Sequence, residues 1–219
     1  MDLKFDSQTG LMPAVAQDRL TGQVRMVAYV NREALEQTLR TGNATFFSRS
    51  RGALWTKGES SGNVLRVHAV YADCDADTLV LLVDPEGPSC HTGRPSCFFR
   101  RLGPDGAVES EAVEAEPFLQ ALEGILRERT ASTAERSYTR SLLDGGAEKI
   151  GKKMREEADE YARALAAETD DRVLNEAADV LYHLLVGLRL RGLEVRSLLA
   201  VLASRTKQSG HAEKASRNR

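Results

Sequence analysis

One candidate site gathers all three cysteines of the chain with three aspartates and a histidine: Cys74, Cys90, Cys97, Asp73, Asp75, Asp77 and His91. Three thiolates leave a tetrahedral Zn²⁺ one open position for water, as catalytic zinc requires, and the ion lowers the pKa of that water toward neutrality. The carboxylates instead suit Mg²⁺, which prefers oxygen ligands. If Cys74 lies in a regular strand, its side chain faces away from its aspartate neighbours, and two metal sites can lie close together. Buried cysteines and an aspartate turn between strands are the alternative interpretation.

A second candidate site is the polar, glycine-rich stretch of residues 46–63, whose composition suits phosphate oxygens. Its basic residues are Arg49, Arg51 and Lys57. Arginine donates paired hydrogen bonds to phosphate, and glycine lets backbone N–H groups approach phosphate oxygens closely. A solvent-exposed hairpin between two strands has the same composition, so the pattern alone leaves both interpretations open.

The third candidate site consists of acidic residues at helical spacing: Glu156, Glu157, Glu160, Glu176 and Asp179. On an α-helix, steps of three and four residues return to one face, so the first three acids share one stripe and the last two share another. Carboxylates this close repel one another, and Mg²⁺ is the natural cation to compensate them. The alternative is a solvated acidic face that is neutralised by Lys149, Lys152, Lys153 and Arg155.

The first hundred residues have a β-rich pattern, which positions the first two candidate sites on or beside strands. Strands are predicted at Ala14–Gln17, Val24–Val30, Ala44–Ser48, Val64–Tyr71 and Leu79–Val83. A helix is predicted at Arg32–Arg40, because Asn31 is a good N-cap and Gly42 a typical stop. This half is therefore expected to be an α+β domain. Arg25 interrupts the apolar run of the second strand, where we expect it to affect packing without touching the candidate sites.

The second half has the three- and four-residue apolar periodicity of helices. Helices are predicted at Phe118–Arg129, Gly145–Glu168, Arg172–Arg191 and Leu193–Ser204. Four helices with short connections suggest an antiparallel bundle. The Gly- and Pro-rich segment between the halves divides the chain into a first domain (1–105), a linker (106–116) and a second domain (117–206). Residues 207–219 are polar and basic, and we expect them to be disordered.

Composition narrows the possible functions. The chain has 219 residues, of which 42% are hydrophobic, which is enough for two compact cores. A net charge of -2 disfavours nonspecific nucleic-acid binding. No run approaches the roughly 20 apolar residues of a membrane span and the N-terminus is unlike a signal peptide, so a cytoplasmic protein is expected. The odd number of cysteines disfavours a disulfide framework.

The N-terminal motifs resemble the phosphoribosyl-AMP cyclohydrolase family from about residue 11 to residue 100. The matching segments are Phe47–Arg51, Leu54–Glu59, Ser61–Asn63, Asp73–Asp77, Gly87–Gly93 and Ser96–Phe98. The resemblance implies hydrolytic opening of the adenine ring between N1 and C6, in a homodimer that shares zinc on the three cysteines and holds magnesium on the three aspartates. It also implies a nucleotide site lined by the motifs Trp55–Glu59 and Ser61–Asn63. His91 is the candidate for moving the proton between water and the ring nitrogen, with a structural role as the alternative.

The C-terminal acids resemble those of the all-helical MazG-type pyrophosphohydrolases, and more narrowly those of phosphoribosyl-ATP pyrophosphohydrolase. The matching segments are Arg136–Thr139, Lys149–Lys153, Glu156–Glu160 and Glu176–His183. The resemblance implies that Mg²⁺ on a triphosphate is held by Glu157, Glu160, Glu176 and Asp179. Glu156 would be a further ligand or the base for the attacking water. The lysines Lys149, Lys152 and Lys153 would neutralise phosphate charge.

Three hydroxyl residues of the same match, Ser137, Tyr138 and Thr139, either contact the substrate or cap a helix. The two families catalyse successive steps on one metabolite, so the chain is predicted to be a bifunctional enzyme of histidine biosynthesis. It would hydrolyse phosphoribosyl-ATP to phosphoribosyl-AMP and pyrophosphate, and then open the ring of phosphoribosyl-AMP. The alternatives are a pyrophosphohydrolase of free nucleoside triphosphates, and a zinc-stabilised dimerisation module without enzymatic activity.

Overall fold

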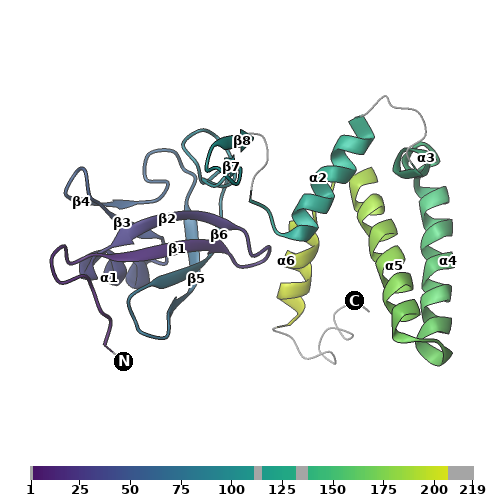
Figure 1. The fold of residues 1–219 in the computed structure, drawn as a ribbon, viewed down its shortest axis with the longest axis horizontal. Helices are drawn as coiled ribbons and strands as arrows, with labels where there is room; N and C mark the ends of the chain where they lie inside the picture. Colours follow the sequence, from purple (N-terminus) through teal and green to yellow (C-terminus); the bar gives the residue numbers. More distant parts are fainter. Residues whose placement is uncertain (1, 111–114, 132–137, 207–219) are drawn as a thin grey trace, which may run out of the picture. The chain divides into compact units, whose positions relative to one another are not determined.

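The computed structural model describes residues 2–110, 115–131 and 138–206, so the tail predicted at 207–219 lies outside the described residues. The chain divides into two compact units, Met1–Pro117 and Phe118–Arg219 (Figure 1). The first contains a sheet and the second is helical. This confirms the expected pairing of one sheet-containing domain with one helical domain.

A six-stranded sheet forms the first unit, in the order β4-β3-β2-β1-β6-β5 (Figure 1). Its strands are β1 (Met12–Asp18), β2 (Val24–Val30), β3 (Thr45–Ser48), β4 (Ala53–Thr56), β5 (Leu65–Ala72) and β6 (Leu79–Pro85). Neighbouring strands are antiparallel except β1 and β6, which run parallel. A small second sheet pairs β7 (Arg101–Leu102) with β8 (Val108–Ser110), and β8 falls within the segment that was assigned to the linker.

Alternating burial explains how the sheet forms a core. Every second residue of β1, from Met12 to Asp18, is buried, as the two-residue period of a strand requires. The inward side chains pack with those of other strands, including Val30, Phe46, Leu65, Leu81 and Val83. Helix α1 (Arg32–Thr41) packs against β3 and β2. Its first turn is capped by Asn31, whose side chain accepts from the Ala34 amide at 2.8 Å.

Five helices are described in the second unit: α2 (Phe118–Ala131), α3 (Tyr138–Asp144), α4 (Gly146–Ala167), α5 (Asp170–Leu190) and α6 (Val195–Arg205). The two long helices α4 and α5 pack along each other. The buried residues of α4 are Ile150, Glu157 and Ala164, which lie seven apart and so form one stripe. A carboxylate therefore occupies a core-facing position. None of the described helices is both long and apolar enough to cross a membrane.

The predicted elements omit β4, the β7–β8 pair and α3. These segments are short: β4 has four residues in a polar, glycine-rich stretch, and α3 has seven. Such lengths carry too few periods for a pattern to stand out. The four-helix prediction is therefore wrong by one helix within the described part of the second unit. Cys74 does not lie in a regular strand, because β5 ends at Ala72 and residues 73–78 turn back into β6. The strand argument for two adjacent metal sites therefore does not apply.

Candidate active sites

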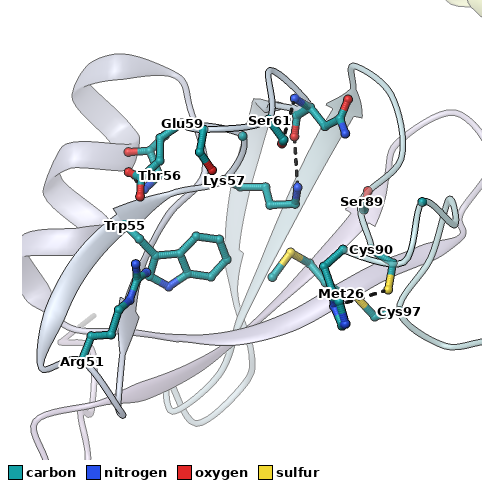
Figure 2. Close-up of a pocket in the computed structure, with 15 residues that line it drawn as sticks. Met26, Arg51, Trp55, Thr56, Lys57, Glu59, Ser61, Ser89, Cys90 and Cys97 are labelled. Atoms are coloured by element: carbon teal, nitrogen blue, oxygen red, sulfur yellow. Dashed lines mark hydrogen bonds between the residues drawn. The ribbon is translucent and has the colours of Figure 1, made fainter.

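A cavity of about 510 Å³ in the first unit gathers most of the residues predicted in its two candidate sites. Its walls include Arg51, Trp55, Lys57, Glu59, Ser61, Asn63, Cys90, His91 and Cys97. In Figure 2, Arg51 and Trp55 lie on one side and the two cysteines on the opposite side, with Lys57 between them. Two segments far apart in sequence, β4 with its following turn and the loop after β6, therefore build one cavity.

Cys90 and Cys97 form a close pair of thiols in this cavity. Cys90 is 6% exposed, and the Thr92 hydroxyl donates to its sulfur at 3.1 Å. Burial raises the pKa of the Cys90 thiol, but hydrogen bonds from Thr92 and Cys97 outweigh burial, so the pKa lies below its ordinary value. Burial, and then the charge of Cys90, raise the pKa of Cys97 to about 11. Nδ1 of His91 lies 3.9 Å from the Cys90 sulfur, so a titratable ring borders the pair.

Lys57 lies beside the thiols. Its Nζ donates to the carbonyl oxygen of Asn63 at 3.1 Å. Burial lowers the pKa of the Lys57 ammonium below its ordinary value, while the charges of Cys97 and Cys90 oppose this shift. The amine expected to contact phosphate is therefore directed toward the cysteine side of the cavity.

Two short hydrogen-bonded turns shape the rim between Thr56 and Asn63. The Glu59 carboxylate accepts from the Thr56 amide at 2.9 Å, and the Ser61 hydroxyl accepts from the Asn63 amide at 3.3 Å. The predicted polar residues thus hold the backbone of the cavity wall. The sequence analysis gave no site role to Met26 and Ser89, which also line the cavity.

Arg49 lines a different hollow, of about 790 Å³, which borders β2 and the turn between β3 and β4. Its guanidinium lies 4.2 Å from the ring centroid of Tyr29. Arg51 and Trp55 line both hollows. The structure therefore separates Arg49 from the cysteine pair and leaves Arg51 as the predicted arginine of the cysteine-lined cavity.

The three aspartates meet in the turn between β5 and β6, where one carboxylate oxygen of each lies within 4.8 Å of the others. Oδ1 of Asp73 accepts from the amides of Asp77 and Thr78 at 3.0 and 3.1 Å. Burial raises the pKa of Asp73, but hydrogen bonds from Thr78 and Asp77 outweigh burial, so the pKa lies below its ordinary value. Three carboxylates this close provide the hard oxygen ligands that Mg²⁺ prefers.

Cys74 lies in the same turn and is exposed. Among the described residues, two groups have ligand atoms that all lie within 4.8 Å of one another: the three aspartates, and three acids of the second unit. Cys74 therefore does not complete a three-thiol group with Cys90 and Cys97 within one chain.

The loop that carries the cysteine pair is fastened to β2. The Cys97 amide donates to the carbonyl oxygen of Arg25 at 2.8 Å, and the Ser96 hydroxyl donates to that of Val24 at 2.8 Å. Nε of Arg25 also donates to the Ser89 hydroxyl at 3.3 Å. The expectation that Arg25 does not touch the candidate sites is wrong. The presence of a charged residue inside an apolar strand could have indicated such a contact from the sequence.

In the second unit, Glu157 of α4 meets Glu176 and Asp179 of α5, with one carboxylate oxygen of each within 4.8 Å of the others. Glu157 and Glu176 are only 6% and 3% exposed, which excludes a purely solvated acidic face. Glu160 is not a member of this group and lies 3.7 Å from Arg163. Two facing helices thus bring together three of the four acids that were predicted to bind metal.

Basic residues partly balance these acids. Nζ of Lys153 lies 3.0 Å from the Glu156 carboxylate and 2.9 Å from that of Glu157, and hydrogen bonds to Glu157 and Glu156 raise the pKa of Lys153. Arg172 pairs with Glu176 and also with Glu168. The sequence analysis missed Arg172, although its four-residue spacing from Glu176 on the predicted helix Arg172–Arg191 was a usable signal.

The other two predicted lysines, Lys149 and Lys152, line a separate hollow of about 340 Å³ with Gly145, Glu148 and Arg155. Nζ of Lys149 donates to the carbonyl oxygen of Ser141 at 3.0 Å. Among the three predicted lysines, Lys153 is the one with a described ion pair to the acid group.

A hydrogen-bonded network joins α3 to the acid-bearing helix α5. Nδ1 of His183 lies 2.8 Å from the carbonyl oxygen of Asp179, so Nδ1 must carry the proton. Nε2 of the same ring lies 2.9 Å from the Tyr138 hydroxyl. The hydroxyls of Thr139 and Tyr182 lie 2.7 Å apart. Tyr138 and Thr139 therefore hold α3 on α5, whereas Ser137 lies outside the described residues.

Comparison with known proteins accounts for both units. Residues 26–99 match the family model of phosphoribosyl-AMP cyclohydrolase, and residues 119–206 match that of phosphoribosyl-ATP pyrophosphohydrolase. The histidine biosynthesis bifunctional protein HisIE of Wolinella succinogenes is 42% identical over 212 residues, which cover 94% of this chain and 93% of that protein. The HisIE protein of Shewanella oneidensis is 44% identical over 204 residues, which cover 93% of this chain and 91% of that protein. The chain belongs to the bifunctional HisIE family.

As a member of the HisIE family, the chain is a bifunctional hydrolase of histidine biosynthesis, with its cyclohydrolase domain before its pyrophosphohydrolase domain. This confirms the predicted activities and their order along the chain. It does not favour a pyrophosphohydrolase of free nucleoside triphosphates or a dimerisation module without activity. The cysteine-lined cavity lies in the HisIE cyclohydrolase unit, and the acid group lies in the pyrophosphohydrolase unit.

Proposed function

We propose that the cysteine-lined cavity binds phosphoribosyl-AMP and opens its adenine ring. The observation that carries this proposal is the gathering of Trp55, Arg51 and His91 around the thiols of Cys90 and Cys97 in one cavity of about 510 Å³. An indole stacks on a base, a guanidinium donates to phosphate, and a cavity of this volume suits a small ligand. Lys57 adds positive charge beside the thiols, while Glu59, Ser61 and Asn63 hold the turn that shapes the wall.

The thiols of Cys90 and Cys97 fit Zn²⁺, for which sulfur is a suitable ligand. We assign the third zinc ligand to the partner's Cys74, in a homodimer that shares the site. The exposure of Cys74 and its separation from the other two thiols within one chain support this assignment. Bound zinc supplies a Lewis acid and a water of near-neutral pKa. His91 is assigned the transfer of a proton from that water to the ring nitrogen.

The three aspartates after β5 are assigned to Mg²⁺, because their carboxylate oxygens lie within 4.8 Å of one another. Arg49 lies in the neighbouring hollow rather than in the cysteine-lined cavity. Its role as a phosphate contact therefore requires a ligand that extends past Arg51 and Trp55, the residues shared by both hollows.

The acid group of the second unit is assigned to phosphoribosyl-ATP hydrolysis. Glu157, Glu176 and Asp179 would hold Mg²⁺, with Glu160 as a fourth ligand, and Glu156 would be a further ligand or the base that activates water. Bound magnesium neutralises charge on the triphosphate. Two core-facing carboxylates support this assignment, because burial of acidic side chains is costly unless a cation balances them. Lys149, Lys152 and Lys153 are assigned to phosphate charge.

The proposal extends to the arrangement of the chain. The helical domain is assigned a MazG-like architecture, supported by its paired acid-bearing helices α4 and α5. The functional domains are taken as residues 1–105 and 117–206 with a linker at 106–116, and the enzyme as a cytoplasmic homodimer.

Mass spectrometry of the products from phosphoribosyl-ATP, with Mg²⁺ and Zn²⁺ present, tests these assignments in the full chain. The wild type is expected to form the ring-opened monophosphate. Cys90→Ala is expected to stop at phosphoribosyl-AMP, and Glu157→Gln to leave the triphosphate intact. Each variant keeps the other site, so the reaction of that site with its own substrate shows that the rest of the chain is intact, and thermal unfolding of the altered unit shows whether that unit is folded.

Three results would contradict the proposal. A wild type that is folded and zinc-loaded yet leaves phosphoribosyl-ATP untouched would refute the substrate. Preference for free deoxynucleoside triphosphates would support the alternative pyrophosphohydrolase. Ring opening at the wild-type rate by Cys90→Ala would remove the cysteine pair from the mechanism.

A further inference from the structure

Arg25 occupies an irregular position in β2. The pairing with β1 runs from Ala16 opposite Met26 directly to Gln17 opposite Val24, so Arg25 is the extra residue of a β-bulge. A bulge redirects the side chain of the extra residue, and bulges are common next to active sites. The irregularity lies beside Met26, which lines the cysteine-lined cavity.

The side chain of Arg25 is buried although arginine is among the residues most often exposed. It is 8% exposed, whereas Val27, two positions further along the strand, is 46% exposed. Nη1 donates to the Gln23 side-chain oxygen at 2.6 Å, and Nε donates to the Ser89 hydroxyl at 3.3 Å. Gln23 and Ser89 are themselves 5% and 4% exposed. The guanidinium is therefore held by Gln23, the residue just before β2, and directed at Ser89, the residue before Cys90.

Both ends of the cysteine loop are attached at this bulge. At one end, the Arg25 side chain contacts Ser89. At the other end, the carbonyl oxygen of Arg25 accepts from the Cys97 amide at 2.8 Å. The neighbouring strand β3 pairs with β2 at Tyr29, which is near the opposite end of β2 from Arg25. The end of β2 that carries Arg25 can therefore bind the backbone of the loop. One residue therefore contacts both ends of the loop that carries Cys90 and Cys97.

We propose that Arg25 is a positioning residue of the cyclohydrolase, which sets the separation of the two thiols by holding Ser89 at one end of the loop and Cys97 at the other. This inference rests on the proposed role of Cys90 and Cys97 as zinc ligands. Metal sites depend strongly on the groups that orient their ligands, and loss of such a group typically costs about 10- to 100-fold in metal affinity or activity.

The test compares Arg25→Leu, Arg25→Lys and Ser89→Ala in the full chain. Arg19→Leu is the matched control, because Arg19 forms an ion pair with Asp84 at 2.7 Å in the same sheet and has no described contact with the loop. The zinc dissociation constant, measured by competition with a chromophoric chelator, is expected to rise about 10- to 100-fold in Arg25→Leu. It is expected to rise less in Arg25→Lys, which keeps a donor, and to stay at the wild-type value in Arg19→Leu.

A second readout needs no metal. Amide hydrogen exchange of the metal-free protein is expected to be faster at residues 89–97 in Arg25→Leu and Ser89→Ala than in the wild type, and unchanged there in Arg19→Leu. Fluorescence of Trp55, the only tryptophan and a residue of the same unit as Arg25, reports whether that unit is folded. In the double variant Arg25→Leu/Ser89→Ala, the two effects on zinc affinity are expected to be less than additive, because each change removes the same hydrogen bond between Arg25 and Ser89.

The outcomes separate the two proposals. A folded wild type that binds no zinc would overturn the zinc assignment and this inference together. Tight wild-type zinc binding, with Arg25→Leu equal to wild type in both affinity and exchange, would overturn the inference alone. If Arg25→Leu does not fold, Ser89→Ala decides, because it removes one hydroxyl; unchanged zinc affinity and exchange in that variant would overturn the inference.

Discussion

Replacing Asp179 by asparagine should uncouple the stability of the helical unit from magnesium. Asp179 is exposed, and its carboxylate shares a volume with two core-facing acids, Glu157 and Glu176. Asparagine keeps the size of the side chain and removes one negative charge. We expect the metal-free variant to be at least as stable as the metal-free wild type, and its stabilisation by Mg²⁺ to be much smaller.

The magnitudes follow from the distances. Two unit charges within 4.8 Å of each other repel by about 1 kcal/mol when water screens them, so Asp179→Asn removes on the order of 2 kcal/mol of repulsion from its two neighbours. Lys153 and Arg172 already offset part of it, which leaves about 1 kcal/mol. In the wild type, Mg²⁺ at one hundred times its dissociation constant adds about 2.7 kcal/mol. For a domain of this size that is a rise in Tm of roughly 10–20 °C.

The assay is thermal unfolding of the full chain over a series of MgCl₂ concentrations. Trp55 is the only tryptophan, so its fluorescence follows the first unit, while far-ultraviolet circular dichroism follows mainly the helices. Asp159→Asn is the matched control, because Asp159 is an exposed acid two residues from Glu157 and points to a different side of α4. The assignment of the acid group would be refuted if Mg²⁺ raised the Tm of Asp179→Asn as much as that of the wild type. It would also be refuted if Asp159→Asn lost as much of this rise in Tm as Asp179→Asn.

Three further predictions address other parts of the molecule. In metal-free protein, the rate of alkylation of Cys97 should increase about ten-fold per pH unit between pH 8 and 10, because the thiolate reacts and a pKa of about 11 keeps Cys97 mostly protonated. The alkylation rate of Cys90, whose pKa is lowered, should reach its plateau at lower pH. Peptide mass spectra separate the two cysteines, and coincident pH profiles would contradict this prediction. Asp75→Asn should reduce ring opening by ten-fold or more, on the order of a lost metal-site group, and leave pyrophosphate release unchanged in the product assay. Leu142→Ala should lower the free energy of unfolding of the helical unit by about 2–5 kcal/mol in urea titrations, because Leu142 is 0% exposed in that core; a loss below about 1 kcal/mol would contradict the packing.

Local patterns predicted the regular elements well. The bounds of β2 match the predicted strand Val24–Val30, and α1 extends one residue beyond the predicted helix Arg32–Arg40. In both cases several side chains repeat with one period, and α1 also has an N-cap and a glycine stop. α3 was not predicted, because seven residues give scarcely two helical turns and its contacts with Tyr182 and His183 are distant in sequence.

The candidate sites were predictable where chemistry and family motif coincide, and not where a contact depends on tertiary structure. Trp55, Lys57 and Cys90 meet in one cavity, yet nothing in the sequence indicates that Met26 of another strand completes its wall. Helical spacing placed Glu157 and Glu160 on one stripe, but spacing cannot tell how far each carboxylate reaches. The ligand atom of Glu157 joins the group and that of Glu160 does not.

If the acid group binds magnesium and a triphosphate, as proposed, its ion pairs couple the binding of the two. Lys153 is shared by Glu156 and Glu157, and Arg172 is shared by Glu168 and Glu176, so the described cations are fewer than the carboxylates they serve. The group therefore keeps an excess of negative charge, which repels a free triphosphate. A divalent cation on Glu157 would reduce that excess and compete with Lys153 for the carboxylate. Lys153 would then be free to turn toward phosphate, the role predicted for it from the sequence.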